Sequence, residues 1–333
     1  MHMSDALLNP VVGGAMLAVS AGAIALSVRK ISKEQLDEGK LPMMAVSGAF
    51  VFAAQMINFT IPGTGSSGHI GGGALLAALL GPFPALITIA AVLLIQALCF
   101  ADGGLIAYGC NVFNMGVIPC LIVWPVMRRV FQKDGWSVGR LRASGALTAF
   151  AGLELGAFCV VLQTMLSGIT LLPFKPFTAL MLPIHAAIGL GESLVTAAVL
   201  SYVYRARPEW FADRTAGAST RSLKPVLVTL LIATVAVGGL LSLYASAYPD
   251  GLEWSIARVS DEEPEASAPS FNVAATIQET TAFMPDYGFA NGADESAALG
   301  TSVSGILGAA MTALLAGGAG AAAYLTKKKR KSA

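Results

Sequence analysis

Long runs of apolar residues recur along this chain, and they restrict its fold more than any other feature of the sequence. Several runs reach about 18 residues or more, the length at which an α-helix crosses a hydrocarbon core of about 30 Å. The composition agrees, because 55% of the residues are hydrophobic, 12% are charged and the mean hydropathy is +0.68. These values lie outside the range of soluble globular proteins. The sequence therefore predicts an all-α integral membrane protein.

The apolar segments predict nine membrane-spanning helices. Their expected ranges are 10–28, 42–60, 71–81, 84–101, 104–127, 144–170, 178–204, 225–247 and 303–325. Gly81 and Pro82 form a turn between the third and fourth segments, because paired glycine and proline interrupt helices. The third segment is short and begins with glycines, so it is not required to cross the bilayer completely.

The basic residues assign a side of the membrane to each loop, because Lys and Arg concentrate on the cytoplasmic side. With the N-terminus outside, the cytoplasmic segments are 29–40, 81–84, 128–143, 205–224 and the C-terminal tail. They contain all but two of the 21 basic residues: Arg29, Lys30, Lys33, Lys40, Arg128, Arg129, Lys133, Arg140, Arg142, Arg205, Arg207, Arg214, Arg221, Lys224 and Lys327 to Lys331. Only Lys175 and Arg258 remain outside. Since these residues are scattered over short loops, we expect contact with membrane lipid and no binding of nucleic acid.

A seam divides the chain into two parts. Residues 1–206 contain seven spans joined by short loops, and residues 207–224 form a cytoplasmic linker. Residues 225–333 contain two further spans that flank an acidic extracytoplasmic loop, residues 248–302. Part of this loop, including residues 261–265, has the composition of a poorly ordered segment. Its acidity is typical of a solvated surface, and attraction of cations and a docking role remain alternatives.

Histidine is rare in this chain, and two of its three histidines fall on the predicted outer side. The charge order around the first span is the reverse of that in a signal peptide, so Met1 and His2 are expected to remain in the mature protein. The N-terminal amine, the backbone nitrogen of residue 2 and the imidazole of His2 can form adjacent chelate rings around one metal ion. Such an all-nitrogen set favours Ni(II) or Cu(II). A random terminal residue is the alternative.

His69 lies in a glycine-rich loop, residues 64–73, on the same predicted side as His2. Glycines let a backbone approach a ligand closely, so this loop can present its histidine to a site. A flexible turn with an incidental histidine is the alternative for the loop taken alone.

Several polar residues lie within the apolar segments, where they are costly and usually functional or paired. Asp102 ends the fourth span on its outer side, and Asn111 and Asn114 share one face of the fifth span. His185 lies near the outer end of the seventh span. These four residues are candidates for a second layer around a metal ion, and direct ligation by His185 is an alternative.

The remaining buried polar residues predict structural roles. Gln96, Glu154 and Glu192 are expected to be internal hydrogen-bond partners. All four cysteines lie in or beside apolar segments, namely Cys99, Cys110, Cys120 and Cys159. They predict small buried side chains and neither a disulfide framework nor a metal site.

Five motifs follow one another within residues 1–206. They are Met-His-Met-Ser-Asp at the N-terminus, Gly-Ser-Ser-Gly-His-Ile-Gly-Gly-Gly at 65–73, Gln-Ala-Leu-Cys-Phe-Ala-Asp-Gly-Gly at 96–104, Asn-Val-Phe-Asn-Met-Gly at 111–116 and His-Ala-Ala-Ile-Gly-Leu-Gly-Glu at 185–192. In this order they resemble the CbiM/NikM family, the substrate-capture (S) components of energy-coupling factor importers for cobalt and nickel. Ser4 and Ala6 depart from the proline and glycine expected around Asp5, which alters a helix lead-in and no ligand.

The tail resembles a second module. Tyr-Pro-Asp-Gly-Leu-Glu-Trp at 248–254 and Met-Pro-Asp-Tyr at 284–287 are similar to the PDGLE domain, an analogue of the small N component. The resemblance thus implies an S-component-like bundle of seven helices fused to a NikN-like pair of helices. It also implies a multi-pass protein of a prokaryotic cell membrane, with its N-terminus outside and its C-terminus in the cytoplasm.

The resemblance implies a planar site of four nitrogens for the transported ion. They are the amine of Met1, the amide and imidazole nitrogens of His2 and an imidazole nitrogen of His69. Binding then releases protons from the amine and the amide, so affinity should rise with pH. Ni(II) or Co(II) is the transported substrate and no cofactor is bound permanently. The sequence does not separate the two ions, although the fused tail slightly favours nickel.

The resemblance also implies partner subunits. The chain has no G-x-x-x-x-G-K-[ST] motif, so ATP hydrolysis would belong to separate cytoplasmic ATPase (CbiO/NikO-like) subunits acting through a transmembrane T component (CbiQ/NikQ-like). Ala49 and Ala53 form a small-xxx-small face that is a candidate contact for the T component. The chain itself is therefore expected to be a transporter subunit and no enzyme.

A different class uses the same buried polar residues. His185, Glu192 and Glu154 could serve a proton-coupled secondary carrier or an intramembrane metal-dependent enzyme. The chain contains no HExxH motif and no obvious inverted repeat, which disfavours both alternatives. Dependence of uptake on an external ATPase separates the two classes.

Overall fold

The computed structural model describes the chain except for residues 34–38, 134, 171, 212–221, 261–268, 290–296 and 332–333. Its main elements are α1 (Pro10–Lys33), α2 (Lys40–Gln55), β1 (Phe59–Ile61), β2 (Ser66–Gly68), α3 (Gly73–Leu80), α4 (Pro82–Phe100), α5 (Tyr108–Val112), α6 (Trp124–Phe131), α7 (Val138–Ser167), α8 (Phe174–Ala206), α9 (Lys224–Val235), α10 (Gly251–Ala257), α11 (Pro269–Thr281) and α12 (Ala297–Lys331). A π-helical segment, Phe113–Val123, joins α5 to α6, and short helical turns lie at Asp5–Leu7, Pro208–Trp210, Ala236–Leu240, Leu241–Tyr244 and Pro285–Tyr287.

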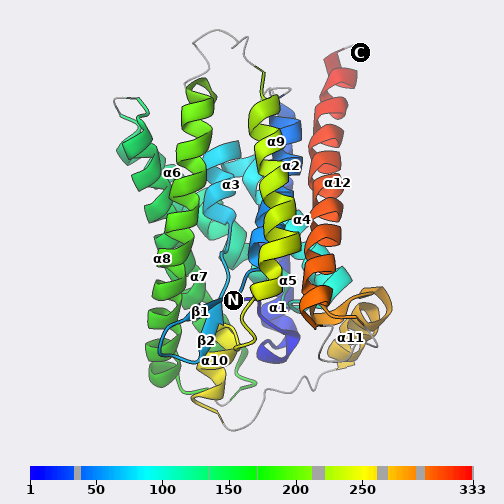
Figure 1. Cartoon of the computed structure of the whole chain (residues 1–333). Coiled ribbons are helices and arrows are strands. Elements are labelled where there is room, and N and C mark those ends of the chain that lie inside the picture. The colour runs from blue at the N-terminus through cyan, green and yellow to red at the C-terminus, as the bar shows by residue number, and fades with distance from the viewer. Residues whose placement is uncertain are drawn as a thin grey trace.

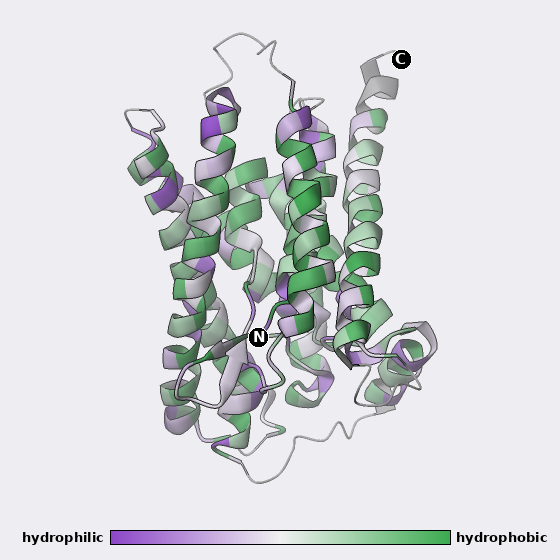
Figure 2. Ribbon diagram, viewed as in Figure 1, coloured by the Kyte–Doolittle hydropathy of each residue, from purple (hydrophilic) through white to green (hydrophobic). Residues whose placement is uncertain are grey.

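Seven helices of the described chain are long and apolar enough to cross a membrane. They are Pro10–Lys33, Pro82–Phe100, Tyr108–Phe131, Val138–Ser167, Phe174–Ala206, Lys224–Tyr244 and Ala298–Leu325. Figure 2 shows apolar residues along the length of the bundle. The prediction of a helical multi-pass membrane protein is therefore confirmed. The second and third of the nine expected spans correspond to α2, with 16 residues, and α3, with 8 residues. Both helices are shorter than the 18 residues required of a candidate span.

The third expected span is a half-helix preceded by non-helical chain. The Leu80 carbonyl accepts a hydrogen bond from Lys40 Nζ at 3.2 Å, so the end of α3 lies beside the start of α2. Trp210 Nε1 donates to the Leu79 carbonyl at 2.8 Å, which places the same end beside the end of α8. Residues 69–72 in extended form plus the α3 helix would cover at most about 25 Å, at about 3.3 and 1.5 Å per residue. The α3 helix with the chain before it is therefore too short to cross a hydrocarbon core of about 30 Å completely.

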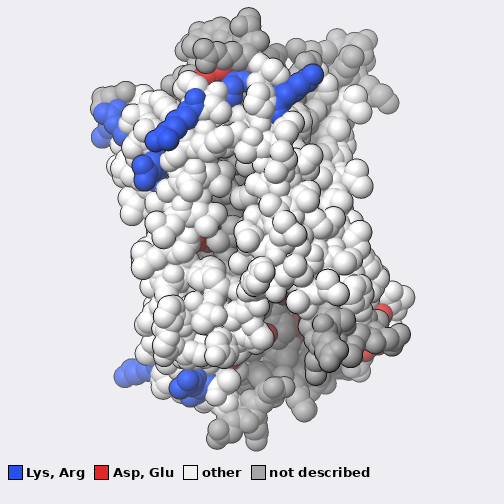
Figure 3. Space-filling model, viewed as in Figure 1, with Lys and Arg blue, Asp and Glu red and all other residues white. Residues whose placement is uncertain are grey.

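The charged residues separate along the bundle axis. Figure 3 shows Lys and Arg gathered at one end, which in Figure 1 carries the C-terminus and the free end of α6. Few basic residues lie at the opposite end. Arg214 and Arg221 lie outside the described residues, as do the side chains of 327–331.

The two tail helices α9 and α12 pack against α2 (Figure 1). Ala49 is 3% exposed and Ala53 is completely buried. A Cβ on Gly238, in the turn after α9, would lie 3.2 Å from the Cβ of Ala53. Both side chains are thus buried within the chain itself, and a contact of Ala49 and Ala53 with a T component stays a prediction. Small residues do mark a close helix crossing here, but the partner helices belong to the tail of the same chain.

The loop between the two tail helices α9 and α12 contains described structure on both sides of its gaps. Helices α10 and α11 and the turn Pro285–Tyr287 lie within it. The acidic run 261–265, for which poor order is expected, lies outside the described residues. Figure 1 places α10 next to β1, β2 and the N-terminus, and α11 beside the lower end of α12.

Candidate metal centre

The loop that carries His69 begins with a small hairpin. Strands β1 and β2 pair antiparallel, with Phe59 opposite Gly68 and Ile61 opposite Ser66. Gly63 and Gly65 in the turn have φ values of +77° and +74°, a region that favours glycine. His69 follows β2 directly, so the hairpin fixes the point from which its imidazole projects.

Buried polar groups hold the chain after His69. Glu192 on α8 accepts hydrogen bonds from the backbone nitrogens of Gly71 and Gly72, each at 2.9 Å. Gln55 Nε2 donates to the Gly71 carbonyl at 2.9 Å, and Gln96 Nε2 donates to Gln55 Oε1 at 2.9 Å. The expected structural roles of Glu192 and Gln96 are confirmed. Since unpaired polar groups are costly when buried, this network fixes the His69 loop inside the bundle.

The N-terminal residues are held by the chain that follows α4. Asn111 Oδ1 accepts from the Met3 nitrogen at 2.8 Å, and Asn111 Nδ2 donates to the Met3 carbonyl at 3.1 Å. Asp5 Oδ1 accepts from the Ala107 nitrogen at 2.8 Å. A Cβ on Gly104 would overlap the Asp5 carboxylate, which explains the glycine there. Asn111 therefore positions Met3 directly.

Asn114 acts one layer further out. Its amide exchanges two hydrogen bonds with that of Gln163, at 2.8 and 3.0 Å. Its Nδ2 also lies 3.8 Å from Met3 Sδ. The structure thus places Asn114 against Met3, and Asn114 also lines a small cavity together with Met1.

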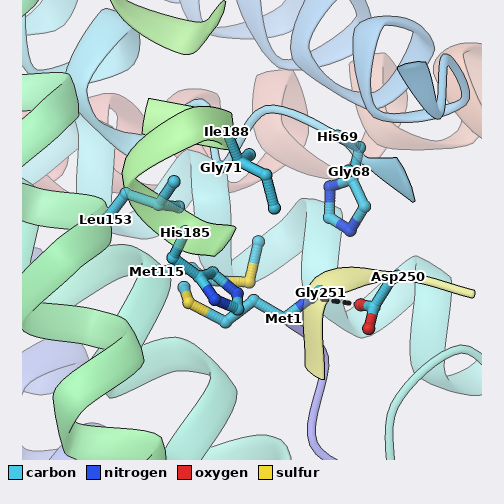
Figure 4. A pocket seen from close by; sticks show the side chains of 10 residues that line it. All are labelled: Met1, Gly68, His69, Gly71, Met115, Leu153, His185, Ile188, Asp250 and Gly251. Carbon is cyan, nitrogen blue, oxygen red and sulfur yellow. Dashed lines mark hydrogen bonds and ion pairs between the residues drawn. The ribbon is translucent and has the colours of Figure 1, made fainter. Parts of the chain in front are cut away.

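His2 and His69 meet at one place in the structure. The imidazole rings of His2 and His69 stack, with their centroids 5.0 Å apart and an interplanar angle of 17°. Met1 and His69 line one cavity together with His185 and Asp250 (Figure 4). Residues 1, 2 and 69, which the sequence predicts as ligands, are therefore neighbours in the structure.

Both imidazoles lie in surroundings that keep them neutral. Burial, followed by the charge of the N-terminal ammonium, lowers the pKa of His2 to about 3. The same two causes, in the same order, lower the pKa of His69 to about 4. His69 Nδ1 lies 3.0 Å from the Ile70 carbonyl, an acceptor, so Nδ1 carries the proton and Nε2 keeps its lone pair. A neutral imidazole with a free lone pair is the form that binds a metal ion.

Asp250 of the tail reaches the N-terminus. Its Oδ2 lies 2.5 Å from the ammonium nitrogen of Met1, and its Oδ1 caps α10 by accepting from the nitrogens of Leu252 and Glu253. Although burial raises the pKa of Asp250, the ammonium and these hydrogen bonds lower it below its usual range. In the sequence, Asp250 is one of several acidic residues in its loop, and nothing there indicates that it contacts Met1.

A second tail residue reaches the site through Asp102. Asp102 Oδ2 lies 3.3 Å from His2 Nδ1 and accepts a hydrogen bond from the Tyr287 hydroxyl at 2.5 Å. Burial is the largest influence on Asp102 and raises its pKa. Tyr287 has a left-handed backbone with φ +60°, an uncommon conformation for a bulky residue. In the sequence, Tyr287 is visible only as the last residue of a family motif.

The tail also binds the hairpin that precedes His69. The Ser67 nitrogen donates to the Pro249 carbonyl at 2.8 Å, and Ser67 Oγ donates to the Tyr248 carbonyl at 2.7 Å. Trp254 Nε1 donates to the Thr64 carbonyl at 3.0 Å. The PDGLE-like segment therefore contacts both the hairpin and the N-terminus.

His185 lies in the same cavity but is held differently. Its Nδ1 lies 2.7 Å from the Met181 carbonyl, one turn back on α8, and its Nε2 has no hydrogen-bond partner among the described residues. Glu154 Oε1 is likewise without a partner there, so no hydrogen bond supports the structural role expected of that oxygen.

No group of three or more His, Cys, Asp or Glu side chains is placed to hold a metal ion within the described part of the chain. A metal at this site would therefore depend on main-chain nitrogen as well as on the two imidazoles. The four cysteines are free, as the sequence predicts, and Cys110 and Cys120 are buried, whereas Cys99 and Cys159 are only partly buried.

Comparisons with known proteins identify families for both parts of the chain. Residues 2–210 match the family described as cobalt uptake substrate-specific transmembrane region, CbiM, and residues 224–325 match the PDGLE domain. The chain is 32% identical to the fused nickel transport protein NikMN of Rhodobacter capsulatus, over 66% of each chain. It is 30% identical to the cobalt transport protein CbiM of Geobacter sulfurreducens, over 72% of each chain. A crystal structure of a transition metal transporter superposes with a TM-score of 0.56 at 27% identity, covering 65% of this chain and all of that one.

These relatives are named as metal transport proteins rather than as enzymes, which agrees with the class that the sequence predicts for this chain. The boundary between the two matched families, residues 210 to 224, falls in the expected linker.

Proposed function

Because the chain belongs to the CbiM family of cobalt uptake substrate-specific transmembrane regions, we propose that it is the substrate-capture component of an ATP-driven importer for nickel or cobalt ions. The observation that carries this proposal is the convergence of Met1, His2 and His69. The imidazoles of His2 and His69 stack with their centroids 5.0 Å apart, and Met1 and His69 line one cavity, although residues 2 and 69 are far apart in the sequence.

The proposed ligands are four nitrogens. They are the amine of Met1, the deprotonated amide and Nδ1 of His2, and Nε2 of His69. The first three close a five-membered and a six-membered ring, and the fourth completes a plane that suits Ni(II). Both imidazoles are already neutral, so only the amine and the amide release protons on binding.

Metal binding at these atoms requires that two of them exchange a carboxylate partner for the metal ion. The amine must leave Asp250, and His2 Nδ1 must leave Asp102. Both carboxylates then lie next to the cation without being its ligands, and their negative charge favours entry of a positive ion. We propose that the tail acts in this loading step, because it supplies Asp250 and orients Asp102 through Tyr287.

The proposed orientation places the metal site outside the cell and the C-terminus in the cytoplasm. The gathering of Lys and Arg at the other end of the bundle supports this orientation. A T component and cytoplasmic ATPase subunits would complete the importer and release the ion inward. The fused NikMN relative is named for nickel, which supports a slight preference for nickel over cobalt.

Uptake of radioactive nickel tests the proposal. Cells that express the chain with its T and ATPase partners should accumulate the ion, and a partner ATPase that cannot hydrolyse ATP should abolish accumulation. Uptake by vesicles that contain this chain alone and a proton gradient would contradict the proposal and indicate a secondary carrier.

A further inference from the structure

We propose that His185 and Met115 form a second, inner position for the transported metal ion, which receives the ion from the outer nitrogen site. This inference rests on the proposed function, because it describes the next step of the same ion. It concerns residues that take no part in the outer ligand set.

The imidazole of His185 has the geometry of a metal ligand, and its Nε2 is unpaired among the described residues. Its side chain is completely buried on α8. A hydrogen bond at 2.7 Å ties Nδ1 to the Met181 carbonyl, which fixes the proton on Nδ1 and leaves the lone pair on Nε2. Nε2 has no partner among the described residues. A buried polar atom without a partner is costly, so this nitrogen is expected to serve an occupant of the cavity.

The cavity next to His185 adjoins the outer site. Met1, His69 and Asp250 line it on the outer side, and His185 and Met115 line it as well. Figure 4 shows the imidazole of His185 beside two thioether side chains, those of Met1 and Met115. An ion that leaves His69 and the amine therefore meets one imidazole nitrogen and thioether sulfur within the same cavity.

Gly251 of the tail covers this position. A Cβ on Gly251 would lie 3.0 Å from His185 Cε1, so the tail backbone packs directly against the imidazole. The tail residue next to Asp250 therefore closes the inner position from outside, while Asp250 itself holds the amine. Among the described residues, the cavity that His185 lines is shared with Met1 and His69 of the outer site.

A second small cavity continues inward from the first. Met1, Met115 and Gly71 line both cavities, and Glu192 lines the inner one. Glu192 lies two helical turns beyond His185 on α8, or about 10 Å along its axis. Polar groups thus follow one another from the outer site towards the middle of the bundle.

The proposed ligand atoms of the inner position, His185 Nε2 and a thioether sulfur, suit weak and short-lived binding of the ion. One imidazole and a thioether hold Ni(II) or Co(II) less firmly than a chelate of four nitrogens, because thioethers prefer softer ions. A transport pathway needs positions that bind strongly enough to admit the ion and weakly enough to release it. The outer site would supply selectivity and the inner position would supply onward movement.

Cobalt titration of a chain with one glycine added before Met1 tests the inner position, because that addition removes the outer chelate. The visible absorption of Co(II) should reveal weaker residual binding. His185→Asn keeps a donor for the Met181 carbonyl but removes Nε2, and it should weaken the residual binding at least about tenfold. Met115→Leu should weaken it about threefold, whereas the exposed Met165→Leu should leave it unchanged. Residual binding that is indifferent to His185→Asn would overturn the inference and leave water as the occupant.

Uptake with the partner subunits separates this inference from the proposed function. With a native N-terminus, His185→Asn should reduce nickel uptake at least about tenfold and reduce tightly retained metal much less. Equal losses of uptake and retained metal would assign His185 to the outer site and contradict an inner position. If the unaltered chain neither retains metal nor supports uptake, the proposed function itself fails.

Discussion

The domain of residues 1–206 and the tail of residues 225–333 contribute different chemistry to one site. All three histidines lie in the first domain, and so do the buried amides that fix the N-terminus and the His69 loop. The tail contributes no histidine, yet Asp250 contacts the Met1 ammonium and Tyr287 contacts Asp102. The comparison separates the groups proposed to bind the ion from those proposed to control its entry. Changes in the first domain should therefore reduce affinity, and changes in the tail should reduce loading.

The largest expected effect within the first domain is at His69. His69→Ala removes one of four nitrogens and opens the site to water, so affinity for nickel should fall at least about a hundredfold. His185→Ala should reduce affinity at the outer site much less, by about tenfold at most, because His185 lies outside the proposed set of four nitrogens. Equilibrium binding to purified protein measures both changes. Equal losses would remove the distinction between the two histidines.

Removal of the tail tests the other side of the comparison. A chain truncated after Arg221 should fold, assemble with the T component and take up metal poorly in cells. Helices α9 and α12 cover α2, so folding of the truncated chain has to be checked by its elution as a single species. Uptake equal to that of the complete chain would show that the tail is dispensable.

Asp250→Asn should be the most damaging single change in the tail. It removes the charge next to the amine but keeps an oxygen that can cap α10, so the loading rate should fall about tenfold. Glu253→Gln is the matched control, since Glu253 lies in the same turn and caps the backbone nitrogen of Asp250. Rapid-mixing measurements of nickel binding distinguish the two variants. A larger effect of Glu253→Gln would indicate that α10 matters and the ion pair does not.

The contact between Met1 and Asp250 is an example of a feature that could not be predicted from the sequence. The apolar runs and the distribution of Lys and Arg predict the bundle, because both follow directly from bilayer physics. The pairing of His2 with His69 could be predicted from their common side of the membrane. The pairing of Met1 with Asp250 could not, because a carboxylate in an acidic loop carries no signal of its partner 249 residues away. The packing of α9 and α12 on α2 could not be predicted for a similar reason, since small residues such as Ala49 and Ala53 mark a close helix crossing and do not identify the crossing helix.

The pH dependence of binding separates the two kinds of nitrogen. The pKa values of His2 and His69 are lowered to about 3 and about 4, so proton competition at the imidazoles is confined to acid below these values. Above pH 5 the imidazoles stay neutral, and affinity should still rise with pH because the amine and amide release protons. Calorimetry in buffers of different ionisation enthalpy counts those protons. Binding that is independent of pH between 6 and 8 would exclude the amine and the amide as ligands.

The smallest expected effect is at Tyr287. Tyr287→Phe removes one hydrogen bond to Asp102 but keeps the ring that stacks on Phe100, so loading should slow only about threefold. A decrease in equilibrium affinity without a change in loading rate would show that Tyr287 helps to hold the metal ligands in place. The tail would then contribute to affinity as well as to loading.

The most direct test of the central claim is the metal content of protein with an altered terminus. One glycine added before Met1 displaces the amine from the chelate ring, whereas the same glycine added after Ala333 leaves the site untouched. Purified from medium with equal traces of nickel and cobalt, the first protein should retain less than about a tenth of the metal found in the second. Equal metal content in the two proteins would contradict the account, because the N-terminal amine would then not be a ligand.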